Sequence, residues 1–191
     1  AAFTDNSKLY EKINELRSHG MVRDRSKLKK NDGPWYYEMH EVGYNYRITD
    51  FQCALGSNQL KKLDFFVQKR RKIAKKYDQS FSNFDKLKTP EIINSVRHSY
   101  HLYPLQVDFD KTQYDKKQFF NKMKKIGVNL QVHYIPVHLQ PFYQNVYGFK
   151  SGDFPISESF FRKEVSLPIY PGLSSDNVLM VINNVSEIID N

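Results

Sequence analysis

Apolar residues recur at helical spacing soon after the start of the chain. Leu9, Ile13 and Leu16 follow a run of cap-forming residues at 5–7, and Gly20 comes shortly after the last of them. Asp, Asn and Ser are favoured at helix N-termini, and Gly is favoured just past helix C-termini. The pattern therefore predicts a helix that begins near residue 6 and ends near Gly20.

The strongest helical pattern runs from Thr49 to about Phe81. Thr49, followed by Gln52 three positions later, has the spacing of a capping box. Apolar residues then recur at near-helical spacing, while Lys and Arg occupy the outward side, and Cys53 is expected in the core. At 1.5 Å per residue such a helix would be roughly 45–50 Å long. A helix of that length is expected to connect two domains.

The rest of the chain mixes strand and helix patterns. Residues 101–110, 128–135 and 165–170 read as strands, residues 114–126 read as a helix, and Ser174 is placed to cap a last helix. Strands alternating with helices predict an α+β domain with a short antiparallel sheet, connected by the long helix and spanning 50–191.

The first residues, Ala1–Thr4, read as the end of a strand whose sheet partners are not in the chain. We therefore expect 1–49 to be the tail of a larger domain and the whole chain to be the C-terminal part of a longer α/β protein. The strand end would also leave an open sheet edge.

The charge balance is basic, with 29 Lys and Arg against 21 Asp and Glu. A solvated surface accounts for such a balance, and so does a preference for anionic partners such as nucleic acid or phosphorylated metabolites. A chain with one cysteine forms no internal disulfide, which is typical of a reducing compartment, and the cytoplasm is expected. No apolar run approaches the ~20 residues of a membrane span, so no membrane partner is expected.

Asn45 and Arg47 lie directly ahead of the capped helix that starts at Thr49. The positive end of a helix dipole favours anions, and amide and guanidinium groups both donate hydrogen bonds to phosphate. These two residues are candidates for an anion site. The alternative is that both side chains satisfy carbonyls of their own loop.

The stretch "VHYIPVHLQPFY" presents His133, Tyr134 and His138 around two prolines. Pro136 prevents the two histidines from sharing a helix face, and no thiol or nearby carboxylate completes a ligand set, so no metal is expected. A rigid loop that offers imidazole and phenol groups to a ligand and a packed aromatic loop both remain open.

Several segments together resemble the DegT/DnrJ/EryC1/StrS family of sugar aminotransferases. Residues 33–47 look most like the family branch that acts in pseudaminic acid synthesis. The segments occur in the family's order: "LRSHGM" (16–21), "GYNYRITDFQCALGSNQLKKL" (43–63), "HLYPL" (101–105), "GVNLQVHYIPVHLQPFY" (127–143) and "VSLPIYPGLS" (165–174).

The resemblance implies a fold-type I, pyridoxal 5'-phosphate-dependent homodimer with its active site at the dimer interface. Such an enzyme transfers an amino group from glutamate to a keto-sugar carried by a nucleoside diphosphate. Asn45 would reach the partner's cofactor phosphate with Arg47 beside it. His133, Tyr134 and His138 would lie beside the sugar-nucleotide pocket.

The family's Schiff-base lysine would precede Ala1, so no catalytic residue is assigned here and this polypeptide alone is expected not to transaminate. Rival interpretations remain: a sugar dehydratase of the same family, a non-catalytic interaction module from a split gene, and a basic nucleic-acid binder. Neither zinc-finger spacing nor an RNA-binding signature accompanies the basic residues, so nucleic acid is not the expected partner.

Overall fold

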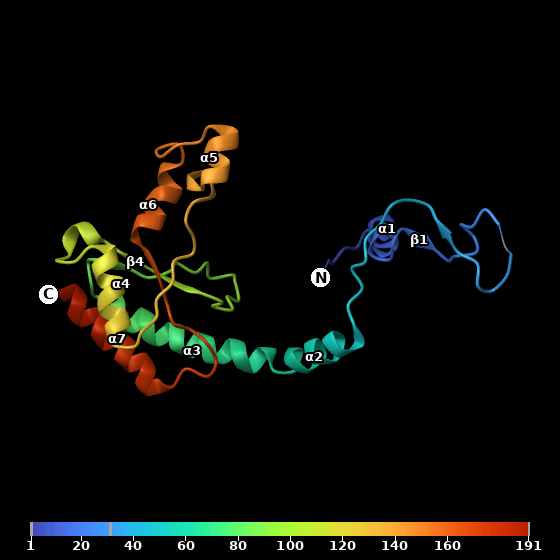
Figure 1. Ribbon diagram of the computed structural model, residues 1–191. Coiled ribbons are helices and arrows are strands. Elements are labelled where there is room, and N and C mark those ends of the chain that lie inside the picture. Colours follow the sequence, from blue (N-terminus) through green and yellow to red (C-terminus); the bar gives the residue numbers. More distant parts are fainter. Residues whose placement is uncertain (1, 31, 191) are drawn as a thin grey trace. The chain divides into compact units, whose positions relative to one another are not determined.

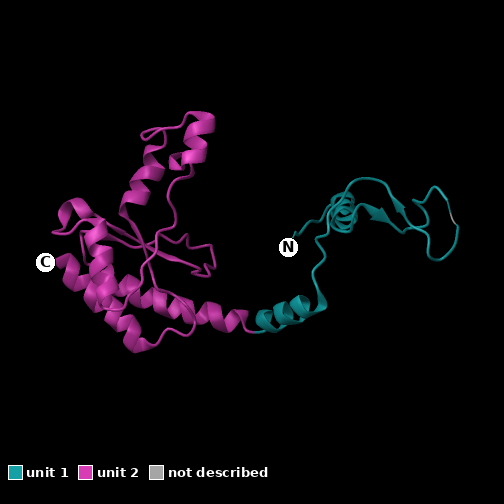
Figure 2. Ribbon diagram, in the orientation of Figure 1, with its two compact units in different colours: residues 1–61 teal, residues 62–191 magenta. Residues whose placement is uncertain are grey.

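The computed structural model describes residues 2–30 and 32–190 (Figure 1). The chain forms two compact units, unit 1 at 1–61 and unit 2 at 62–191 (Figure 2). The expected division at 49/50 concerns the domains of a longer protein and stays a prediction. Residues 2–4 form no strand, and Ala1 lies outside the described residues.

Unit 1 begins with the expected first helix, whose presence is confirmed. Its N-cap is Asn6, whose side-chain oxygen accepts a hydrogen bond from the Leu9 N–H at 3.1 Å. Two very short strands and a second helix follow. The elements of unit 1 are α1 (Ser7–Arg17), β1 (Met21–Val22), β2 (Glu38–Met39) and α2 (Asp50–Leu60).

The antiparallel hairpin of β1 and β2 is held partly by one carboxylate. Glu38 accepts hydrogen bonds from the backbone N–H groups of Lys29 at 2.8 Å and Lys30 at 3.1 Å. It also contacts the Tyr36 hydroxyl at 3.0 Å and the His40 Nε2 at 2.7 Å. The hydrogen bond with His40 is the main cause that lowers the pKa of Glu38 to about 2. The loop between the strands is thus organised around an ionised side chain.

Unit 1 also contains a close approach of two backbone segments. Gly20 has φ +71°, and a Cβ added there would lie 1.9 Å from the carbonyl oxygen of Glu41. A Cβ added at Gly43 would lie 2.2 Å from the backbone nitrogen of Gly20. Two glycines at this crossing let the segment after β2 lie against the end of α1.

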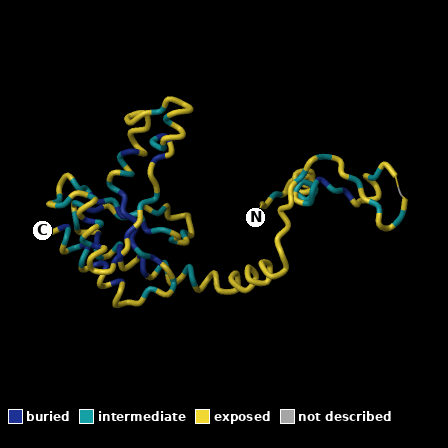
Figure 3. The backbone as a smooth tube through the Cα atoms, in the orientation of Figure 1, coloured by how far each residue is buried: buried dark blue, intermediate teal, exposed yellow. Residues whose placement is uncertain are grey.

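The expected long helix is present as two helices, α2 and α3 (Leu63–Phe81). The capping box is confirmed, because the Gln52 N–H donates to Thr49 Oγ1 at 3.3 Å and the Thr49 N–H donates to Gln52 Oε1 at 3.0 Å. The two residues between the helices keep helix-like dihedral angles, so the interruption is small. It falls where burial changes, since α3 has one buried face and α2 has none (Figure 3).

The expectation that Cys53 is a core residue is wrong for this chain. Its thiol is free and the residue is exposed. The periodic apolar residues of α2 have no core to cover among the described residues of unit 1.

Unit 2 is built on a three-stranded antiparallel sheet in the order β3-β4-β5. The expected strands near 101–110 and 165–170 are confirmed in shortened form, and β3 was not expected. Along the central strand β4 every second residue is buried, as a strand with one covered face requires. The three strands are β3 (Leu87–Lys88), β4 (Tyr103–Val107) and β5 (Glu164–Leu167).

The expected strand at 128–135 is wrong. Gln131 forms only an isolated antiparallel bridge with Ser166. Two residues later the His133 N–H donates to the Glu164 carboxylate at 3.0 Å rather than to a strand carbonyl. Pro136 then has no N–H to offer. The alternating pattern is present, but the backbone partners that would make a strand are not.

The hydrophobic core of unit 2 lies between the sheet and helices α3, α4 and α7 (Figure 1). The cap predicted for the last helix is confirmed, because Ser174 Oγ accepts from the Asn177 N–H at 3.2 Å. Asp115, which was not predicted as a cap, forms a capping box with Gln118 at the start of α4. The remaining elements of unit 2 are η1 (Phe109–Lys111), α4 (Lys116–Lys125), η2 (Val137–Leu139), α5 (Pro141–Tyr147), α6 (Pro155–Lys163) and α7 (Ser175–Asp190). No helix in the described part of the chain combines the length and apolar character needed to span a membrane.

Candidate functional site

The segment at 43–47 is held in place by main-chain hydrogen bonds to the end of α1. The Tyr44 N–H donates to the Leu16 carbonyl at 2.7 Å, and the Tyr46 N–H donates to the Arg17 carbonyl at 3.0 Å. The His19 N–H donates to the Tyr44 carbonyl at 2.8 Å. Carbonyls at a helix C-terminus have no partner within the helix, so the segment satisfies them while α1 fixes its position.

The side chains of this segment alternate as in a strand. The Tyr44 and Tyr46 rings stack with centroids 4.9 Å apart and an angle of 3° between their planes. The two predicted anion ligands also contact each other, because the Arg47 Nε–H donates to Asn45 Oδ1 at 3.1 Å. Asn45 and Arg47 are both exposed. The structure therefore brings the two together and presents them at the surface of unit 1.

A third polar side chain joins them. His19 Nε2 lies 3.5 Å from Arg47 Nη2, and His19 has a positive φ of 64°. From the sequence alone His19 reads as an isolated structural residue next to Gly20. Its contact with Arg47 depends on the hydrogen bonds that join 43–47 to α1, so a local pattern gives no signal for it.

The donor set of this cluster fits an anion. Because Asn45 Oδ1 accepts from Arg47 Nε, the Asn45 amide turns its oxygen inward and leaves two N–H groups to donate. The guanidinium N–H groups of Arg47 that face neither Asn45 nor His19 add further donors. His19 Nε2 accepts from Arg47, so the neutral ring can donate only through Nδ1. Amide and guanidinium N–H donors are what a phosphate or carboxylate group requires. We call His19, Asn45 and Arg47 the donor cluster.

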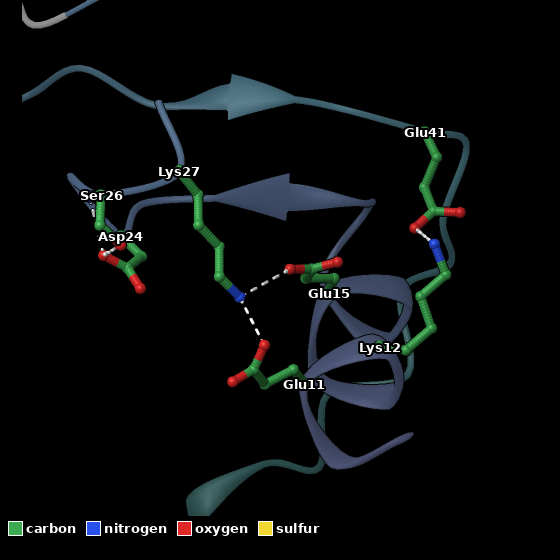
Figure 4. A network of polar contacts seen from close by, with 7 residues as sticks. All are labelled: Glu11, Lys12, Glu15, Asp24, Ser26, Lys27 and Glu41. Atoms are coloured by element: carbon green, nitrogen blue, oxygen red, sulfur yellow. Dashed lines mark hydrogen bonds and ion pairs between the residues drawn. The ribbon is translucent and has the colours of Figure 1, made fainter. Parts of the chain in front are cut away.

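A pocket of about 530 Å³ in unit 1 is lined in part by Arg47. Its charges are mixed and largely paired, since Lys27 Nζ lies 2.6 Å from Glu11 and 3.7 Å from Glu15 (Figure 4). Asp24 also lines the pocket and accepts from Ser26, which lowers its pKa. Carboxylates in the wall make this pocket a poor anion site compared with the donor cluster.

In unit 2 the structure holds His133 firmly. Its backbone N–H donates to Glu164 Oε2 at 3.0 Å, and its Nδ1 lies 2.8 Å from Ser166 Oγ. Tyr134 follows with 71 % of its surface exposed, and the two rings make an edge-on contact with centroids 4.6 Å apart. The predicted pair therefore presents one oriented imidazole and one exposed phenol.

His138 lies in a different setting. It is buried, and its Nε2 lies 2.9 Å from Glu158 Oε1. Glu158 also accepts from the Gly152 N–H at 2.8 Å and from the Ser151 hydroxyl at 3.1 Å. The hydrogen bond from His138 is the largest cause that lowers the pKa of Glu158 to about 2. His138 thus ties η2 to α6, and its part in ligand binding stays a prediction.

Metal-ligating side chains do not gather in the described residues. No group of three or more His, Cys, Asp or Glu with the spacing for a metal ion occurs within 2–30 and 32–190.

Comparison with known proteins gives the class to which this arrangement belongs. The model of the DegT/DnrJ/EryC1/StrS aminotransferase family matches residues 1–186. The chain belongs to this family.

Individual relatives agree with the family match. An uncharacterized protein of Methanocaldococcus jannaschii, MJ1066, is 44% identical over 186 residues, which are 97% of this chain and 48% of that protein. The UDP-4-amino-4,6-dideoxy-N-acetyl-beta-L-altrosamine transaminase of Campylobacter jejuni is 34% identical over 190 residues, or 100% of this chain and 48% of the relative. Among solved structures, the PLP form of Spr1654 from Streptococcus pneumoniae aligns with a TM-score of 0.84 and 26% identity, covering 98% of this chain and 45% of that one.

The chain spans about half the length of the curated relatives it matches. The expected fold class is confirmed by the structural likeness: the chain has the C-terminal portion of a fold-type I transferase, with connecting helices and a small antiparallel sheet.

Proposed function

We propose that this chain is the part of a pyridoxal 5'-phosphate-dependent sugar aminotransferase that supplies a phosphate contact and one wall of the sugar-nucleotide pocket. The observation that carries the proposal is the donor cluster, whose backbone is held by main-chain hydrogen bonds to the end of α1 and whose side chains contact one another. The family match over 1–186 supports the reaction class. The amino donor is glutamate and the acceptor is a keto-sugar attached to a nucleoside diphosphate.

The phosphate contact is assigned to Asn45 and Arg47. The Asn45 N–H groups and the Arg47 guanidinium donate to the cofactor phosphate of a partner subunit. When bound, pyridoxal phosphate supplies the electron sink that lets an amino group leave one substrate and join another. The chain's own contribution is to bind that group by its phosphate and to fix its position against the protein.

A homodimer is part of the same proposal. The segment around α2 exposes a run of large apolar side chains, with Ile48 at 59 %, Phe51 at 80 % and Leu60 at 68 % of their surface exposed. Apolar surface of this extent is costly to leave in water, and a second copy of the chain is the occupant we assign to it.

The sugar-nucleotide wall is assigned to the loop at 133–138. His133 and Tyr134 offer an imidazole and a phenol for sugar hydroxyl groups, while His138 holds the loop to Glu158. The name of the Campylobacter jejuni relative supports a UDP-linked 4-amino sugar as the product. The solved structure of Helicobacter pylori PseC, an aminotransferase involved in the biosynthesis of pseudaminic acid, supports that pathway. With one cysteine in the chain, a reducing compartment such as the cytoplasm fits the proposal.

The test is an assay on the protein produced from the complete reading frame that contains this chain. With pyridoxal phosphate, glutamate and a UDP-linked 4-keto sugar, we expect 2-oxoglutarate to form in step with the amino sugar. No visible absorbance from bound cofactor and no 2-oxoglutarate would disprove the proposal. The 191-residue chain by itself is expected to be inactive, because none of its lysines lies in a motif that resembles the family's cofactor-attaching lysine.

Two variants locate the phosphate contact. Arg47→Ala and Asn45→Ala are each expected to weaken pyridoxal phosphate binding about 10- to 100-fold, since a hydrogen bond to a charged group contributes about 1.5–3 kcal/mol. Arg25→Ala is the matched control, because it removes the same charge from an exposed position of unit 1. Equal losses in Arg47→Ala and Arg25→Ala would reduce the role of Arg47 to general electrostatics.

A further inference from the structure

A buried carboxylate, a buried hydroxyl and an imidazole form a chain of hydrogen bonds in unit 2. Glu164 is fully buried and Ser166 is 5 % exposed, and both lie on β5. Ser166 Oγ donates to Glu164 Oε1 at 2.5 Å, and His133 Nδ1 lies 2.8 Å from the same Oγ. The bridge between Gln131 and Ser166 places the backbone of the loop beside β5, so His133 lies opposite the Ser166 side chain.

Counting protons along this series of hydrogen bonds determines the tautomer of the His133 imidazole. An ionised Glu164 only accepts, and it receives the Ser166 hydroxyl on Oε1 and the His133 backbone N–H on Oε2. Burial lowers the pKa of Lys116, and the electrostatic interaction with Glu164 acts in the opposite direction. Ser166 has one hydrogen, which it gives to Glu164, so its oxygen accepts from His133. His133 must therefore carry its proton on Nδ1.

We propose that Glu164 and Ser166 are positioning residues that hold His133 with Nδ1 protonated and Nε2 bearing a free lone pair. A neutral imidazole in this state accepts a hydrogen bond from a ligand through Nε2. The ligand group is a hydroxyl or amide N–H, and that it belongs to the sugar of a nucleotide sugar rests on the proposed function. The tautomer itself does not rest on that function.

The same loop contains an internal contrast. His138 contacts Glu158 through Nε2 at 2.9 Å, so its carboxylate partner demands a proton on Nε2. His133 contacts Ser166 through Nδ1. Two histidines five positions apart are thus fixed as opposite tautomers. His138 uses its protonated nitrogen for an interior contact, and His133 leaves its unprotonated nitrogen for a ligand.

The test is a nitrogen-15 NMR measurement of the histidine rings in the 191-residue chain above pH 7.5, where an ordinary imidazole is neutral. We expect His133 to show a protonated Nδ1 and an unprotonated Nε2, and His138 to show a protonated Nε2. A His133 signal with its proton on Nε2 would overturn the proposal, whatever the protein's activity.

Substitutions at Glu164 and Ser166 test whether these two residues set the tautomer of His133. In Glu164→Gln the backbone N–H of His133 still needs an acceptor, so the amide oxygen turns toward it and the NH₂ faces Ser166. Ser166 then donates to His133 Nδ1, and the tautomer reverses. An unchanged His133 signal in a folded Glu164→Gln variant would contradict the role given to Glu164.

Ser166→Ala removes the acceptor and is expected to shift His133 toward the Nε2 proton, while Ser166→Thr keeps the hydroxyl and is expected to restore Nδ1–H. This pair decides the question if Glu164→Gln does not fold, and the His138 signal is the internal control in each variant. A Ser166→Ala spectrum that matches the parent would refute the positioning role of Ser166.

The ligand contact has a separate readout in the protein from the complete reading frame. Glu164→Gln is expected to raise the KM for the sugar nucleotide about fivefold or more and to leave the pyridoxal phosphate affinity unchanged. An unchanged KM would refute the sugar contact even where the tautomer is as proposed. Absence of any transaminase activity in the parent protein would refute the proposed function and leave the NMR result standing.

Discussion

Units 1 and 2 are stabilised in different ways. In the described part of unit 1, Val22 is the one large apolar side chain that is buried, while unit 2 contains a continuous core around Tyr77, Phe81 and Phe119. Figure 3 shows most of the buried backbone in unit 2. Unit 1 is shaped instead by backbone hydrogen bonds, a glycine crossing and ion pairs (Figure 4). Exposed ion pairs contribute little to stability, so unit 1 presents the proposed binding groups on a framework with little burial to support it.

Both units contain a glutamate that accepts hydrogen bonds from a histidine and from backbone N–H groups. These are Glu38 in unit 1 and Glu158 in unit 2, and the pKa of each is lowered to about 2. Only Glu158 has a buried histidine partner, His138. The same polar arrangement thus organises a loop both around a buried histidine and around an exposed one.

The largest difference is expected when the units are produced separately. Residues 62–191 should unfold in urea with one cooperative transition, because the core lies wholly within them. Residues 1–61 should show no cooperative transition by circular dichroism. A sharp transition in 1–61 would mean that its polar contacts suffice, which would remove the contrast.

A large effect is also expected from a cavity in unit 2. Phe119 is fully buried and packs edge-on against Phe109 with ring centroids 5.8 Å apart. Phe119→Ala should lower the free energy of unfolding by about 3–5 kcal/mol. Leu179→Ala, at a half-exposed position of α7, is the control and should cost well under half as much. Similar losses from both, measured by urea unfolding, would argue against a close-packed core.

A smaller effect is expected at the glycine crossing of unit 1. Gly20→Ala places a Cβ where the Glu41 carbonyl lies 1.9 Å away, at a φ of +71°. The cost is roughly 1–3 kcal/mol, as for other strained backbone positions. The measurement is hydrogen exchange at the Tyr44 and Tyr46 amides, which should become faster.

Gly56→Ala is the matched control for that substitution. Gly56 lies inside α2 with nothing within 4 Å of an added Cβ, so Ala there should stabilise the helix by about 0.5–1 kcal/mol. Unchanged exchange in Gly20→Ala would show that the crossing does not hold the segment at 43–47.

The smallest effect is expected from acid. The pKa values of Glu38 and Glu158 fall from an ordinary 4.5 to about 2 in the folded chain. Their contribution to stability is therefore complete above about pH 4.5 and is lost as the pH falls toward 2. The Lys29 and Gly152 amides donate to these carboxylates, so their protection from hydrogen exchange, relative to the intrinsic rate, should decrease as the pH falls through that range. Carboxyl titration midpoints near 4.5 by carbon-13 NMR would contradict the hydrogen-bond assignments.

Local signals in the sequence predicted much of the fold. The capping box of Thr49 and Gln52 and the caps at Asn6 and Ser174 act within three residues, and each is present. Strands of two residues, such as β1 and β3, are too short to show a period. The pattern at 128–135 misled because the partner of the His133 N–H is Glu164, 31 positions away.

In the candidate site, too, local features were predictable from the sequence and contacts between distant residues were not. Asn45 and Arg47 were recognisable because they are two positions apart and precede a capped helix. His19 joins them from 28 positions away, and Ser166 reaches His133 from 33 positions away. Such contacts arise from the folded backbone, and no period or motif in one sequence contains them.

The main-chain hydrogen bonds from Tyr44 and Tyr46 to the carbonyls of Leu16 and Arg17 affect how the sequence of this protein can evolve. Main-chain hydrogen bonds do not depend on which side chain a residue carries. The first helix can therefore accumulate substitutions while the amide of Asn45 and the guanidinium of Arg47 stay in place. Inserting or deleting a single residue near its end would rotate those carbonyls away by about 100° of helix turn. Divergence by replacement should therefore be common at this helix end, and divergence by changes in length should be rare.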